Sequence, residues 1–176
     1  MKRLLLSTVF GFAATLGMSA LPAASANNGS NLIIPGQRVG QTYLGPNGST
    51  YLRKLPKPTS SDAFMQQQQL VWVSKKANRT DTLSIHTISN AALNVQPSNG
   101  VTINRIRVTS NWFHTSPGNL STGSTKAQIL RHFPNARPVS SNPLIYDDVK
   151  GGIAFEFAPK ATDSSPCIAI TAHLPE

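Results

Sequence analysis

The chain has 176 residues, a formal net charge of +9 from 16 Lys and Arg against 7 Asp and Glu, and 39% hydrophobic residues. The hydrophobic fraction can fill a core, which excludes a chain kept disordered by its charge. The only long uncharged stretch is N-terminal, which excludes a multi-pass membrane protein. A single cysteine, Cys167, excludes a disulfide framework and a multi-cysteine metal site.

The first 26 residues have the pattern of a secretory signal peptide. Lys2 and Arg3 provide the positive start, and an apolar run over residues 4–18 follows. Small residues ending at Ala26 provide a cleavage site before Asn27. We therefore expect residues 1–26 to be removed, no transmembrane anchor to remain, and the protein to be secreted or periplasmic.

Two segments of the remaining chain resemble each other. Residues 44–56 and 122–134 align without gaps, and each contains a glycine, a short run of bulky residues and a final proline. This order indicates a turn, a short helix and a helix stop. We predict a flexible tail over 27–35, followed by two tandem units over 36–110 and 111–176.

Each unit is expected to contain one short helix followed by three antiparallel strands. The first helix carries Tyr51, Leu52 and Leu55, and the second, capped by Ser124 or Thr125, carries Ile129, Leu130 and Phe133 on one face. Apolar runs and alternating patterns predict the strands at 70–73, 82–88, 101–109, 144–146, 153–157 and 167–172. The expected fold class is α+β, with the two units forming a curved sheet.

The turn motifs resemble a known family. Val39-Gly40-Gln41-Thr42-Tyr43-Leu44-Gly45, a short helix and then Leu55-Pro56-Lys57-Pro58 resemble the opening of β-lactamase-inhibitor-protein-like modules, which include the SmpA/OmlA-type outer-membrane assembly lipoproteins. The second copy, from Thr122-Gly123-Ser124 to Ala136, is similar to the tandem form. The resemblance implies a secreted, non-enzymatic scaffold whose curved sheet presents one face to a partner. Pro56 replaces a family glycine, and the lipid-carrying cysteine and the inhibitory loop residues have no counterpart.

Catalytic and metal-binding patterns are weak in this sequence. The four histidines form no His-x-His or His-x3-His pair: His86, His114, His132 and His173. Cys167 opens an apolar run and is expected to be buried and inert. Asp147 and Asp148 precede a glycine pair, where aspartate usually bonds to its own turn. We expect no enzymatic activity, no metal and no cofactor.

Positive charge is concentrated in the first three quarters of the chain. Residues 27–137 hold twelve Lys and Arg against two acids, whereas residues 138–176 hold two Lys against five acids. Such an excess attracts acidic partners. Arg105 and Arg107 alternate onto one face of a predicted strand. The candidate binding residues are Arg105, Arg107, Trp112, Phe113, Arg53, Lys54, Lys75 and Lys76.

These features predict an exported, non-enzymatic binding protein of the bacterial envelope. Its basic surface would engage an anionic polymer, a lipid, or a protein with an acidic surface. Nucleic acid is a poor candidate, because the chain is expected to be exported and lacks nucleic-acid-binding motifs. Two alternatives stay open: an inhibitor of a secreted or periplasmic hydrolase, and a hydrolase of an envelope polymer that uses Asp147.

Overall fold

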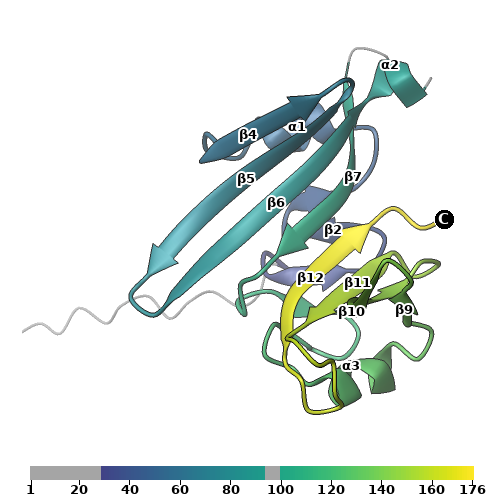
Figure 1. Cartoon of the computed structure of the whole chain (residues 1–176). Coiled ribbons are helices and arrows are strands. Elements are labelled where there is room, and N and C mark those ends of the chain that lie inside the picture. Colours follow the sequence, from purple (N-terminus) through teal and green to yellow (C-terminus); the bar gives the residue numbers. More distant parts are fainter. Residues whose placement is uncertain (1–28, 94–99) are drawn as a thin grey trace, which may run out of the picture.

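The computed structural model describes residues 29–93 and 100–176, arranged as in Figure 1. The predicted signal peptide and its cleavage site between Ala26 and Asn27 lie outside the described residues. Strands make up 48% of the structure and helices 11%. Within the described residues, no helix is long and apolar enough to cross a membrane.

An eight-stranded antiparallel sheet forms the body of the molecule. Its order is β4-β5-β6-β7-β12-β11-β10-β9, so two four-stranded meanders meet where β7 pairs with β12. The strands are β4 (Ser60–Phe64), β5 (Gln67–Lys76), β6 (Arg79–Ser89), β7 (Val101–Val108), β9 (Arg137–Val139), β10 (Asn142–Asp148), β11 (Ile153–Phe157) and β12 (Cys167–His173).

The predicted fold class, two units of one helix plus three strands, is wrong. The six predicted strands are present as β5, β6, β7, β10, β11 and β12, but β4 and β9 extend the sheet at its two ends. The protein is mostly β. All five residues of β4 are exposed, so that strand has no apolar pattern to detect. β9 contains Pro138, which a strand tolerates at a sheet edge.

A second, small sheet packs beside the large one and was not predicted. Its order is β3-β2-β1-β8, with β1 (Leu32–Ile34), β2 (Arg38–Val39), β3 (Thr42–Tyr43) and β8 (His114–Thr115). Ile33 is fully buried, so the segment expected to be a flexible tail contains a strand of the core. β1, in the predicted tail, pairs with β2 of the first predicted unit and in parallel with β8 of the second, and thus links the two predicted units.

The helices are short, and the longest, α3 (Lys126–His132), forms where the sequence predicts it. Thr125 and Gln128 make a reciprocal capping box: the Thr125 hydroxyl accepts from the Gln128 N–H at 3.3 Å, and the Gln128 side chain accepts from the Thr125 N–H at 2.8 Å. Ile129 and Phe133 are buried, as predicted. The other helices are α1 (Gly48–Leu52) and α2 (Asn90–Leu93).

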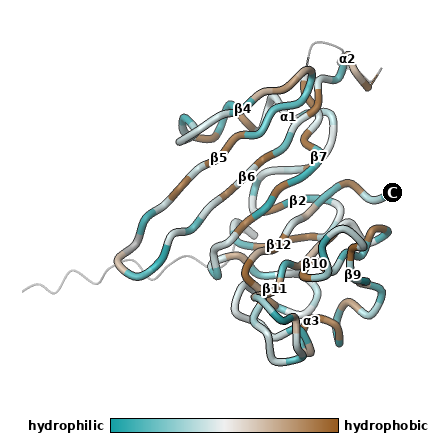
Figure 2. The backbone as a smooth tube through the Cα atoms, viewed as in Figure 1, coloured by the Kyte–Doolittle hydropathy of each residue, from teal (hydrophilic) through white to brown (hydrophobic). Residues whose placement is uncertain are grey.

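One core lies on a single face of the large sheet. Hydrophobic and hydrophilic residues alternate along β6 and β7 in Figure 2, as in a sheet with one covered face. Ile85, Ile106 and Phe155 of the large sheet cluster with Ile33 of β1 and Ile129 of α3. In Figure 1, α1 and the small sheet lie behind the large sheet, and α3 lies below β10 and β11. Nothing in the described part of the chain covers its other face, which we call the open face.

Candidate binding surface

The open face owes its polar character to strand alternation. In β7, Ile106 and Val108 are fully buried on the covered side, whereas Arg105 is exposed and Arg107 is half-buried on the open side. The two arginines therefore share one face, as the sequence predicts.

The ladder places polar partners on both sides of Arg105. His86 of β6 and His173 of β12 are its register neighbours. The same row continues through Gln69 of β5 to Asp62 of β4. Five strands thus contribute one polar row across the middle of the open face.

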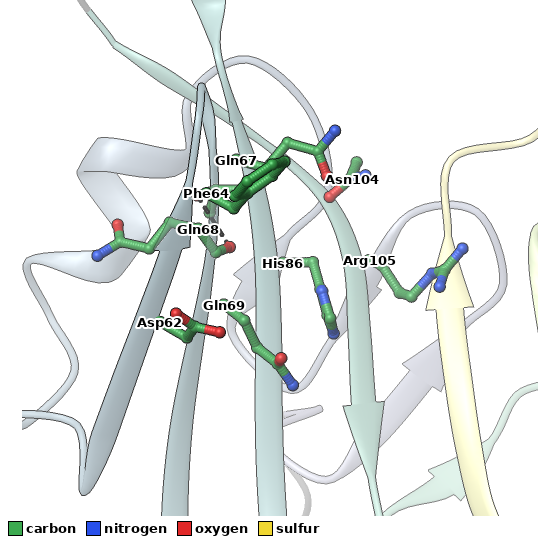
Figure 3. A pocket seen from close by; sticks show the side chains of 9 residues that line it. Asp62, Phe64, Gln67, Gln68, Gln69, His86, Asn104 and Arg105 are labelled. Atoms are coloured by element: carbon green, nitrogen blue, oxygen red, sulfur yellow. Dashed lines mark hydrogen bonds between the residues drawn. The ribbon is translucent and has the colours of Figure 1, made fainter.

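Two cavities follow this row and meet at Arg105. The first, of about 280 Å³, is lined by Asp62, Gln69, His86 and Arg105 among others, and is drawn in Figure 3. The second, of about 320 Å³, is lined by Arg105, Asp147 and His173 among others. Arg105 is the one residue that lines both. We call the two cavities together the Arg105 trough.

The two open-face arginines differ in their partners. Arg107 Nη2 donates to Glu156 Oε2 at 2.6 Å, and both side chains are about one-third exposed, so the charge of Arg107 is compensated. Arg105 makes no hydrogen bond or ion pair with any residue in the described ranges. Its guanidinium extends towards β12 in Figure 3. Arg105 is therefore the uncompensated cation of the trough.

Asp147 and Asp148, which the sequence presents as a pair, have separate roles. Asp148 Oδ1 accepts from the Gly151 N–H at 3.0 Å, which confirms its predicted role in the turn. Asp147 Oδ1 lies 2.8 Å from His173 Nε2, and His173 Nδ1 donates to the Leu174 carbonyl at 2.9 Å. Asp147 thus positions His173 at one end of the Arg105 trough.

His86 lies beside Arg105 as an uncharged group. Partial burial lowers its pKa below the ordinary histidine value, and the positive charges of Arg105 and Arg107 lower that pKa further. The acid that lines the same cavity, Asp62, is exposed on β4. At neutral pH, His86 can therefore donate or accept a hydrogen bond without adding charge.

The lowered pKa of His86 predicts a pH dependence of stability. At pH values between the folded-state pKa of His86 and its unfolded value of about 6.5, His86 is protonated more often in the unfolded chain than in the folded protein. The free energy of unfolding therefore falls as the pH falls through that interval. We expect the urea midpoint to drop more between pH 7 and pH 5 in the wild type than in His86→Gln. Parallel pH profiles of the two proteins would contradict this assignment.

Trp112 and Phe113 lie away from the Arg105 trough, on the covered side of the sheet. Trp112 is 50% exposed and stacks edge-on against the half-buried Phe113, with ring centroids 4.9 Å apart. Together with Trp72 and Pro56 they line a mainly apolar cavity of about 390 Å³, which we call the aromatic groove. Trp72 packs partly against the core, and its Nε1 donates to the Pro56 carbonyl at 2.8 Å.

The other predicted basic residues do not join Arg105. Arg53 follows α1, where its Nε donates to the Ser49 carbonyl at 3.2 Å, and Lys54 Nζ lies 5.7 Å from the centre of the Tyr51 ring. Lys75 is exposed at the end of β5, and the side chain of its neighbour Lys76 lies outside the description. The candidate residues of the sequence therefore belong to at least three separate surfaces.

Two observations bear on chemistry at other positions. Burial raises the pKa of the Cys167 thiol to about 12, so this side chain is a protonated core residue, as predicted. Across residues 29–93 and 100–176, no three His, Cys, Asp or Glu side chains lie close enough together to hold a metal ion.

Sequence reasoning missed the part of the trough that β4 and β5 contribute. Gln69 joins His86 and Arg105 through the pairing of β5 with β6, and Asp62 joins them because β4 adds to the edge of the sheet. The glutamine run at 66–69 was the available signal, since alternate residues of a strand share a face.

Comparisons of this chain with protein-family models, with curated proteins and with solved structures find no match.

Proposed function

We propose that the chain is a non-enzymatic binding protein of the bacterial envelope, and that the Arg105 trough holds an anionic group of an envelope polymer. The observation that carries the proposal is the uncompensated charge of Arg105 where two cavities meet. A guanidinium can bind a carboxylate or phosphate through two parallel hydrogen bonds.

The surroundings of Arg105 favour a ligand with isolated negative charges. His86 is uncharged, Arg107 is compensated by Glu156, and Asp62 would repel a second anion at the far end of the trough. Gln69 and Thr171 offer neutral hydrogen-bonding groups on either side of Arg105. These groups suit a polymer whose carboxylates are separated by hydroxyl or amide groups better than a polymer with closely spaced negative charges.

Two features of the sequence support a location outside the cytoplasm. The first 26 residues carry the pattern of a signal peptide. The turn motifs around Gly45 and Gly123 resemble those of β-lactamase-inhibitor-protein-like modules, which use a sheet face for binding. Both features agree with a binding role at the envelope and add no detail about the ligand.

The test removes the charge of Arg105 without reversing it. We expect Arg105→Gln to reduce retention on a purified, carboxylate-bearing envelope polymer about tenfold at low salt. A hydrogen bond to a charged group contributes roughly 1.5–3 kcal/mol, and about 1.4 kcal/mol corresponds to a factor of ten. Cosedimentation with the insoluble polymer measures the retained fraction.

Lys150→Gln is the matched control, because it removes one positive charge from an exposed turn outside the trough. Its retention should stay within about twofold of the wild type, in line with the small effects of isolated surface charges. Equal losses for the two variants would mean that retention depends on net charge, and the proposed site would be wrong.

A further inference from the structure

The strands β5 and β6 extend beyond the rest of the sheet as a two-stranded arm. β4 pairs with β5 only as far as Val71, whereas β5 continues to Lys76. Figure 1 shows the end of this hairpin projecting past β4. The outer edge of β5 is therefore without a strand partner over its last residues, within the described chain.

Hydrogen bonds around Val73 show which backbone groups face that edge. The Val71 carbonyl accepts from the Thr59 N–H at 2.8 Å, and the Val73 N–H donates to Thr59 Oγ1 at 3.1 Å. Thr82, the register partner of Val73, directs its own N–H and carbonyl towards Thr109. By alternation, the Val73 carbonyl and both backbone groups of Lys75 also face outward, and no described strand pairs with them.

The aromatic groove opens beneath the same stretch of β5. Its lining includes Trp72, Val73 and Ser74 of β5 and Asp81 of β6. The side chains of Trp72 and Ser74 alternate with that of Lys75 and so face the other side of the strand. Pro56 closes the groove beyond the edge of β5, and Trp112 closes it beyond β6. A strand added at this edge would place every second side chain over the groove.

The charge on the opposite side of the arm determines which side chains an added strand should carry on that side. Lys75 is exposed and makes no ion pair within the described chain, and its side chain shares a face with that of Val73. Opposite charges paired directly across two strands stabilise a sheet, and like charges destabilise it. The lysine therefore disfavours a second copy of this arm and favours an acidic strand.

We propose that this edge binds an extended segment of another protein in which acidic and apolar residues alternate. The segment would add a strand to β5 through the Val73 carbonyl and both backbone groups of Lys75. Its apolar side chains would enter the aromatic groove against Trp72 and Trp112, and its carboxylates would pair with Lys75. This surface is separate from the Arg105 trough and does not depend on the function proposed for it.

The test uses a short synthetic peptide that alternates glutamate and valine around a central phenylalanine. Both tryptophans of the chain, Trp72 and Trp112, line the groove, so intrinsic fluorescence reports its occupation directly. We expect a saturable change in emission on titration with the peptide. A twin peptide with N-methylated backbone amides should bind at least about tenfold more weakly, because it cannot pair as a strand.

Variants of the protein then separate the contribution of the groove from that of the lysine charge, with binding followed by anisotropy of a labelled peptide. Trp112→Ala and Lys75→Glu should each weaken binding about tenfold or more, as for interface residues that anchor a partner. Arg105→Gln and Lys150→Glu should leave it unchanged. Equal binding of the methylated twin, or wild-type affinity in both Trp112→Ala and Lys75→Glu, would overturn the proposal. The proposal would also be overturned if the protein did not bind the peptide and instead sedimented with anionic lipid vesicles in a Lys75-dependent manner.

Discussion

Phe155→Ala should lower the free energy of unfolding by about 3–5 kcal/mol, the usual cost of removing a buried phenylalanine ring. Phe155 is fully buried at the centre of β11, and its ring lies 4.9 Å from that of Phe133, between centroids. That contact joins the end of α3 to the large sheet. Truncation leaves a cavity between the two, and equilibrium urea denaturation measures the loss.

Phe64→Ala is the control for this loss, because Phe64 is 73% exposed at the end of β4. We expect its stability to stay within about 0.5 kcal/mol of the wild type. A small effect of Phe155→Ala, comparable with that of the control, would show that α3 does not pack on β11 as described.

Gly152→Ala should lower the free energy of unfolding by roughly 2–5 kcal/mol, through two separate effects. Gly152 has φ +70, a conformation that costs other residues about 1–2 kcal/mol. An added Cβ would also lie 2.5 Å from the His173 carbonyl oxygen and 2.6 Å from the Gly36 Cα. The second effect forces β12 or the turn between β1 and β2 to move, at a further cost of about 1–3 kcal/mol.

Gly123→Ala separates these effects, because Gly123 has φ +96 but nothing within 4 Å of an added Cβ. The variant should lose only the conformational part, about 1–2 kcal/mol. The comparison is made by thermal unfolding, where Gly152→Ala should melt several degrees below Gly123→Ala. Identical melting temperatures would contradict the close contact between Gly152 and Gly36.

The elements with a strong local signal could be predicted from the sequence. α3 has a cap at Thr125 and bulky residues spaced for one helix face, and both determine its position whatever the rest of the chain does. The strands β6 and β7 alternate apolar and polar residues because each has one covered and one open side. The same alternation correctly placed Arg105 and Arg107 on one face.

Elements that depend on distant partners could not be predicted. β4 is exposed along its whole length and exists because β5 offers it an edge, and the two-residue strand β8 exists because it pairs with β1, far earlier in the chain. Because these contacts also join distant parts of the chain, the sequence did not reveal that Glu156 neutralises the charge of Arg107, or that Trp112 faces away from Arg105. Local patterns indicate the face on which a side chain lies, and tertiary pairing determines its neighbours.

The pairing of β7 with β12 has a consequence for how the protein folds. Each four-stranded meander closes through short connections, whereas the register of Arg105 with His173 joins a residue in the middle of the chain to one near its C-terminal end. Closing such a long loop costs more entropy than closing a hairpin, so nonlocal pairs tend to form late. The two cavities that share Arg105 belong one to each meander. The Arg105 trough is therefore completed by the slowest class of contact in the molecule, and a half-folded chain would not possess it.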